Sequence, residues 1–239
     1  MGTSRFVRWL DTRFYPGVEG NWDDTLFRDR VLRVLKSSDR LLDVGGGAGI
    51  LPQMNFRGLA AHIEGVDLDP RVTSNPNIDV GHVANAEAMP FADESFDVVI
   101  ADNVAEHLEN PDAVFAEIRR VLRPGGLFLF KTPNSSHYMP LISRLTPIGF
   151  HKFYNRLRGR NSEDTFQTCY RANSRARVLA IARRSGFKVD YVERVESRPE
   201  YLRISAWTYL AGILYERMVN LTPAMAPFRI LLMAQLRKN

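Results

Sequence analysis

Residues 41–50 read LLDVGGGAGI, a short apolar strand that runs directly into a glycine-rich turn. Gly45, Gly47 and Gly49 alternate along this turn, and a residue without a Cβ allows positive φ and close approach of a ligand. Such a turn after a first parallel strand is where open α/β sheets bind nucleotide-like ligands. A tight turn without a ligand is the alternative for a glycine cluster taken alone.

A second strand that ends in an acidic residue favours the ligand-binding interpretation of the glycine turn. Residues 63–67 read IEGVD, and Asp67 follows the first glycine by about 20 residues, the separation at which a carboxylate meets ribose hydroxyls. The dinucleotide pattern G-x-G-x-x-G requires a glycine where this chain has Ile50, which disfavours a nicotinamide oxidoreductase. Asp43 would repel a pyrophosphate but suits a ligand that carries an ammonium group and a sulfonium.

Length and composition predict one domain over residues 1–239, because 239 residues with 45% hydrophobic content can bury a large core. A single cysteine, Cys169, excludes an internal disulfide and indicates a reducing compartment. Charged residues interrupt the first ten positions, and the longest apolar stretch, 204–215, is too short to cross a bilayer. We expect a cytoplasmic protein.

The charge is unevenly distributed along the chain. Residues 1–133 hold 14 Lys and Arg against 20 Asp and Glu, whereas residues 134–239 hold 18 against 7. This asymmetry indicates either an anionic partner for the C-terminal part or a solvated basic surface.

Strand and helix patterns alternate from residue 39 to residue 132, which predicts a mostly parallel sheet with helices on both faces. We expect strands at 40–44, 62–67, 79–83, 98–101 and 127–130, and helices at 49–58 and 111–122. Two N-terminal helices within 3–38 precede them, the second capped by Asp23 or Asp24. A helix at 174–185, a strand at 187–195, a helix at 201–219 and a strand at 228–236 follow.

Four segments between residues 40 and 133 together carry a family resemblance. They are LLDVGGGAGI, EGVDLDP, NAEAMPFADESFDVVIADNVAEHL and IRRVLRPGGLFLFKTPN. In this order they resemble class I S-adenosylmethionine (SAM) dependent methyltransferases of the type 11, ubiquinone/menaquinone and sugar kind. The resemblance implies a Rossmann-like seven-stranded sheet whose last strand is antiparallel and lies between the fifth and sixth. It also implies a helical cover over residues 1–38 and an acceptor lid inserted at 134–172.

The resemblance assigns cofactor-binding roles near the first two strands. The three turn glycines line the methionine and ribose part of SAM. Asp43 supports the turn or meets the ammonium group, and Asp67, with Leu68 beside it, receives the ribose hydroxyls.

The resemblance also assigns residues further along the chain. Ala86 and Glu87 flank the adenine, while Asp102 and Asn103 lie beside the sulfonium. The family usually has Asp where this chain has Asn85, but an amide oxygen can still accept a hydrogen bond from the adenine amino group.

A hydroxyl acceptor would require a general base, and histidine is the usual choice. His107 is the leading candidate, because it follows the fourth strand, and a helix cap or packing residue is the alternative reading. His137 and His151 are the further candidates. The histidines show no close ligand spacing, so we expect no metal.

We therefore expect SAM-dependent methyl transfer to a small or medium acceptor, such as a hydroxyl of a glycan, glycolipid or other natural-product intermediate. A cluster of basic residues in the insert favours an anionic or lipid-linked acceptor: Lys152, Arg156, Arg158 and Arg160. The alternatives are an RNA or protein methyltransferase and a non-catalytic SAM-binding scaffold. Nucleic acid is not expected, because no N/D-P-P-Y motif follows the fourth strand and no nucleic-acid module is appended.

The expected helix at 201–219 is dense in apolar and aromatic residues. It has three alternative roles: a covered core element, a homodimer face, or a surface helix in peripheral contact with the inner membrane face. A core or dimer role fits better, because its charged residues do not form a broad cationic face.

Overall fold

The computed structural model describes residues 4–18, 21–140 and 168–239. The chain divides into two compact units, each built from three segments. The first unit comprises Met1–Trp22, Pro133–Gln167 and Arg194–Leu231, and the second comprises Asp23–Thr132, Thr168–Glu193 and Leu232–Asn239. The expected single domain, with a cover over 1–38 and a lid over 134–172, stays a prediction. Most of that lid, including the basic cluster of Lys152, Arg156, Arg158 and Arg160, lies outside the described residues.

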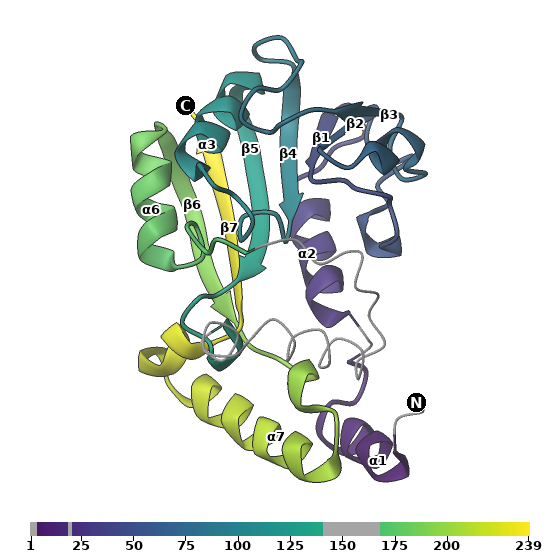
Figure 1. The fold of residues 1–239 in the computed structure, drawn as a ribbon, viewed down its shortest axis with the longest axis vertical. Coiled ribbons are helices and arrows are strands. Elements are labelled where there is room, and N and C mark those ends of the chain that lie inside the picture. The colour runs from purple at the N-terminus through teal and green to yellow at the C-terminus, as the bar shows by residue number, and fades with distance from the viewer. Residues whose placement is uncertain (1–3, 19–20, 141–167) are drawn as a thin grey trace. The chain divides into compact units, whose positions relative to one another are not determined.

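The described residues form a seven-stranded sheet (Figure 1). Its strands are β1 (Arg40–Val44), β2 (His62–Asp67), β3 (Val80–Val83), β4 (Phe96–Asp102), β5 (Leu122–Pro133), β6 (Phe187–Val195) and β7 (Leu231–Lys238). They lie in the order β3-β2-β1-β4-β5-β7-β6. The pairs from β3 to β5 are parallel, and β7 runs opposite to β5 and β6 (Figure 1). The predicted sheet, with an antiparallel strand between the fifth and sixth, is confirmed.

Helices of the second unit cover both faces of this sheet, as the alternating directions of the β5 side chains show. Phe128 and Phe130 belong to the core cluster that contains Phe115 of α3 (Pro111–Val121) and Ile181 of α6 (Arg175–Arg184). Successive side chains of a strand point to opposite faces. Lys131 therefore points to the other face, where it binds carboxylates of α2 (Trp22–Leu32).

The helix expected at residues 49–58 is absent, and this prediction is wrong. Only a short 3₁₀ turn, Pro52–Met54, forms there. Leu51 is extended with ψ 109°, because a proline disfavours helical backbone at the preceding residue. The side-chain amide of Asn77 donates to the carbonyl oxygens of Gly49 and Leu51, at 3.0 and 3.3 Å. An ordered loop, rather than the N-terminus of a helix, therefore follows the glycine turn.

The other predicted elements exist, and three strands (β1, β2 and β6) have the predicted bounds. The C-terminal elements begin later than expected. α7 spans Ala206–Leu221, because Ser205 and Thr208 form a capping box at its start. A 3₁₀ turn at Pro223–Phe228 delays the last strand to Leu231.

The first unit has its own small core between α7 and α1 (Arg5–Phe14). Val7 and Leu10 of α1 pack with Tyr209 and Ile213 of α7. The Tyr209 hydroxyl also donates to Asp11 at 2.5 Å. α7 has a buried face and an opposite face that exposes four large apolar side chains, Trp207, Leu214, Met218 and Leu221. Within the described ranges, no helix has the length and apolar character needed to cross a bilayer.

Gly81 of β3 provides a test of the packing beneath the strand-end loops. A Cβ at this position would lie 2.1 Å from the carbonyl oxygen of Val72. We expect Gly81→Ala to lower the free energy of unfolding by about 1–3 kcal/mol, because backbone rather than a flexible side chain must move. Gly125→Ala is the control, since its Cβ meets no atom within 4 Å and costs only about 1 kcal/mol at φ +78°. Equal stability of the two variants in urea titrations would contradict the packing described.

Candidate active site

Three acidic residues lie at one edge of the sheet, because β1, β2 and β4 are adjacent and parallel. Asp43 of β1 is in register with Gly65 of β2 and Ile100 of β4. Asp67 and Asp102 end β2 and β4. The chain order reverses between β1 and β4, which is where open α/β sheets bind ligands. The structure thus brings together the strand-end aspartates (Asp43, Asp67 and Asp102) that the sequence singles out.

The glycine turn connects these strand ends directly. The Gly47 amide donates to Asp67 Oδ2 at 2.9 Å, and the Asp69 amide donates to Oδ1 at 2.9 Å. Gly45 has φ +79°, and a Cβ there would lie 2.2 Å from Val104 Cγ2. Larger residues are therefore excluded at Gly45, and the Asp67 carboxylate is held by two backbone amides.

Burial controls the charge of two strand-end aspartates. Desolvation, followed by repulsion from Asp102 and Asp67, raises the pKa of Asp43 to about 7. Desolvation also raises the pKa of Asp102 to about 7, although the Lys131 ammonium opposes this rise. Both carboxyl groups are therefore partly protonated near neutral pH when no cation binds beside them.

Lys131 is a site residue that the sequence reasoning missed. Its Nζ lies 2.8 Å from Asp23 Oδ2 and 2.9 Å from Asp102 Oδ1, and it also bonds to Asp24 Oδ1. Asp23 and Asp24 were expected to cap α2, but the helix begins at Trp22 and both lie in its first turn. Burial alone would lower the pKa of Lys131, but the three carboxylates raise it above its ordinary value. The available signal was a lysine inside an otherwise apolar strand, LFLFKTP.

Residues 85–95 form the loop after β3, which carries the predicted adenine-binding residues. The Ala84 amide donates to the carbonyl oxygen of Asp67 at 3.0 Å, which places this loop at the same sheet edge. The Asn85 side-chain oxygen accepts a bond from the Glu87 amide at 2.9 Å and keeps a second lone pair. Ala86 packs against the core, and Glu87 is exposed.

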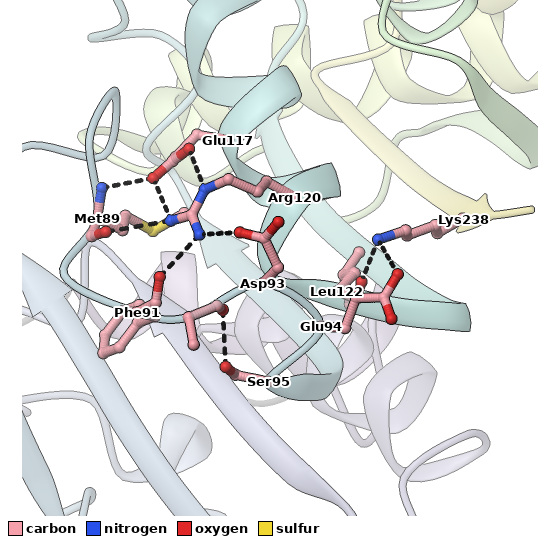
Figure 2. Close-up of polar contacts among 10 residues, drawn as sticks. Met89, Phe91, Asp93, Glu94, Ser95, Glu117, Arg120, Leu122 and Lys238 are labelled. Atoms are coloured by element: carbon pink, nitrogen blue, oxygen red, sulfur yellow. Dashed lines mark hydrogen bonds and ion pairs between the residues drawn. The ribbon is translucent and has the colours of Figure 1, made fainter.

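Arg120 of α3 fixes the middle of this loop, as Figure 2 shows. Its guanidinium donates to the carbonyl oxygens of Met89 and Phe91 and to the Asp93 carboxylate, at 3.2, 2.8 and 2.6 Å (Figure 2). Glu117 binds the same guanidinium and accepts from the Met89 amide at 2.7 Å (Figure 2). Four polar contacts to one helix thus hold the loop in place.

The loop after β4 carries the predicted catalytic residue. Asn103 has φ +53°, a conformation that asparagine tolerates better than most residues, and its amide donates to the Lys131 carbonyl oxygen at 3.0 Å. Glu106 is buried and accepts a 2.7 Å bond from the Thr132 hydroxyl. His107 Nε2 lies 4.0 Å from Glu106 Oε1, and the imidazole is about one-third exposed, at 31%. Burial raises the pKa of Glu106, while the Thr132 bond and His107 oppose the rise.

The other candidate bases do not lie in this loop. His137 belongs to the first unit and is buried, and burial lowers its pKa to about 3. Its Nδ1 accepts the Met139 amide at 3.2 Å, and its Nε2 lies 3.5 Å from Glu196. Both nitrogens therefore have neighbouring partners in the first unit, and the role of His137 as a base stays a prediction. His151 lies outside the described residues.

The comparisons with known proteins agree with this geometry. Residues 42–130 match the methyltransferase domain family. An uncharacterized methyltransferase of Mycolicibacterium gilvum is 33% identical over 199 residues, which cover 76% of each chain. A Mycolicibacterium smegmatis protein named "Probable S-adenosylmethionine-dependent methyltransferase" is 35% identical over 117 residues, or 46% of this chain and 44% of that protein.

A solved structure shows the same fold at low sequence identity. It is the Streptomyces coelicolor geranyl diphosphate C-methyltransferase in complex with Mg²⁺, geranyl diphosphate and S-adenosyl-L-homocysteine, with a TM-score of 0.55. That structure is 16% identical, and the match covers 91% of this chain and 78% of the other. The chain therefore belongs to the class I SAM-dependent methyltransferases, as its sequence motifs indicate, and its cofactor is SAM.

The residues at the sheet edge fit this cofactor chemically. Lys131 Nζ lies 2.9 Å from Oδ1 of the buried Asp102, whereas among the described residues no group hydrogen-bonds Oδ2. A cationic ligand would satisfy this carboxylate. Leu68, directly after Asp67, is 70% exposed and offers an apolar surface to a flat ring.

The raised pKa of Asp43 predicts a stability that depends on pH. An aspartate whose pKa is about 7 in the fold and 3.8 when unfolded loses stability as pH rises between these values, because the unfolded chain releases its proton first. The cost is complete above pH 7 and is at most about 4 kcal/mol. We expect ligand-free Asp43→Asn to gain stability relative to the natural protein between pH 5 and about pH 8. Thermal unfolding across this range measures the difference, and a difference that stays constant would contradict the raised pKa.

Proposed function

We propose that the protein transfers the methyl group of SAM to a hydroxyl of a small or medium acceptor, such as a glycan, glycolipid or other natural-product intermediate. The observation that carries this proposal is the pairing of Glu106 with His107 in the loop that follows β4. A hydroxyl is a poor nucleophile until a base removes its proton, and histidine near a carboxylate is suited to that role.

The cofactor roles proposed for individual residues follow the sheet edge. The turn glycines and Asp43 receive the methionine part, and Asp67 with Leu68 receives the ribose. Asn85, Ala86 and Glu87 surround the adenine, while Asp102 and Asn103 lie beside the sulfonium. When bound, SAM supplies an electrophilic methyl group, so the protein must mainly align the acceptor and exclude water.

His107 would hold the acceptor proton in this proposal. The buried Glu106 carboxylate is anchored by Thr132, whose hydroxyl in turn accepts the Asn173 amide at 2.6 Å. Backbone amides of Cys169 and Tyr170 donate to the Glu106 carbonyl oxygen, at 2.6 and 3.0 Å. These contacts hold Glu106 in place beside His107.

The proposal also covers the charge of the acceptor and the cellular location of the enzyme. The excess of basic residues after position 134 supports an anionic or lipid-linked acceptor. The exposed apolar side chains of α7 support either a homodimer or peripheral contact with the inner membrane face in a cytoplasmic enzyme.

The test is transfer of isotope-labelled methyl from SAM to a panel of phenolic, sugar and glycolipid acceptors. With an accepted substrate, we expect His107→Ala to lower kcat by about 10²-fold or more and to leave the Kd of SAM unchanged, because the lost group acts on the acceptor. His62→Ala is the control, since His62 lies at the start of β2. Full activity of His107→Ala would remove the proposed base, and SAM binding without any transfer would favour a non-catalytic scaffold.

A further inference from the structure

The second unit gathers more negative charge at the site than its own ammonium group can balance. Lys131 contacts Asp23, Asp24 and Asp102, and Asp102 in turn raises the pKa of the neighbouring Asp43. Asp43 and Asp67 lie at the same end of the sheet, so five carboxyl groups occur there beside one lysine, which contacts three of them. The charge of Asp67 is satisfied by two backbone amides.

This excess is costly for the fold alone. A single carboxylate would neutralise Lys131, and each additional buried carboxylate loses its hydration without a full partner. Asp102 shows this cost, because it shares Lys131 with two other carboxylates and its Oδ2 has no hydrogen-bond partner among the described residues. An excess of buried negative charge beside a ligand site indicates that a positive ligand completes it.

The cofactor and its product differ in this property. SAM carries a sulfonium, an ammonium and a carboxylate, and is therefore a net cation. S-adenosylhomocysteine has a neutral thioether in place of the sulfonium and carries no net charge. Electrostatic attraction to the carboxylates thus acts on the cofactor and is weaker for the product.

We propose that Asp23 and Asp24 of α2, acting through Lys131, make the site favour the cationic cofactor relative to its neutral product. Without them, the charge of Lys131 would lie 2.9 Å from Asp102 and cancel it. With them, the charges of Asp23 and Asp24 outweigh the single ammonium, so the cluster stays net negative toward the cofactor even though the same two aspartates also raise the pKa of Asp102. The two aspartates are positioning residues, and the inference rests on the cofactor placement given under the proposed function.

A structural role for the same contacts predicts a different result. If Asp23 and Asp24 only anchor α2, their loss should loosen the site and weaken the binding of SAM and of S-adenosylhomocysteine equally. If the two aspartates set the charge of the site, their loss should weaken the binding of cationic ligands selectively. The ratio of two dissociation constants therefore separates the roles.

The experiment is isothermal titration of SAM, S-adenosylhomocysteine and sinefungin, which carries an ammonium in place of the sulfonium. We expect Asp23→Asn to raise the Kd of SAM and sinefungin about three- to tenfold, and the Kd of S-adenosylhomocysteine less than twofold. The Asp23 side chain is 32% exposed, so the amide should be tolerated. Asp29→Asn is the matched control, an exposed aspartate on the same helix. Asp24→Asn repeats the test should the first variant fail to fold.

An equal change in the Kd of all three ligands, or no change in the Kd of any, would overturn the inference and leave the two aspartates as anchors of α2. Failure of the natural protein to bind either SAM or S-adenosylhomocysteine would instead overturn the proposed cofactor placement.

Discussion

The ion cluster around Lys131 holds three elements of the second unit together. The ammonium of β5 binds Asp23 and Asp24 at the start of α2 and Asp102 at the end of β4. Loss of one partner from a buried ion pair commonly costs about 3–5 kcal/mol, because the remaining charge is left unbalanced. The cluster therefore determines where the loop after β4 begins, and with it the position of Asn103 and His107.

Buried carboxylates at the same edge of the sheet lower the stability of the fold, and the fold does not require them. Asp43 and Asp102 are buried with pKa values of about 7, so ionising them opposes folding above neutral pH. Polar groups that lower stability tend to occur at sites that bind or react. A cofactor with a net positive charge would recover this cost on binding, which explains why the carboxylates occur in one place.

Local sequence signals were sufficient for the sheet. β1, β2 and β6 have their predicted bounds, because apolar runs between turn residues leave little choice of strand ends. The helix at 49–58 was predicted wrongly, because the effect of Pro52 on Leu51 outweighs the apolar pattern.

The candidate site was only partly predictable. The strand-end aspartates and glycines come from contiguous motifs that topology brings to one edge. Lys131 and its α2 partners are about 108 positions apart, and no local pattern predicts a contact over that separation. The Glu106–Thr132–Asn173 chain is non-local in the same way.

We infer that the strand-end aspartates and the glycine turn form the SAM site. Calorimetric titration of SAM into the natural protein and into Asp67→Ala tests it most directly, because Asp67 holds the Gly47 amide and is the proposed ribose ligand. We expect micromolar binding to the natural protein and at least about tenfold weaker binding to the variant. Equal affinity of the two folded proteins would contradict it.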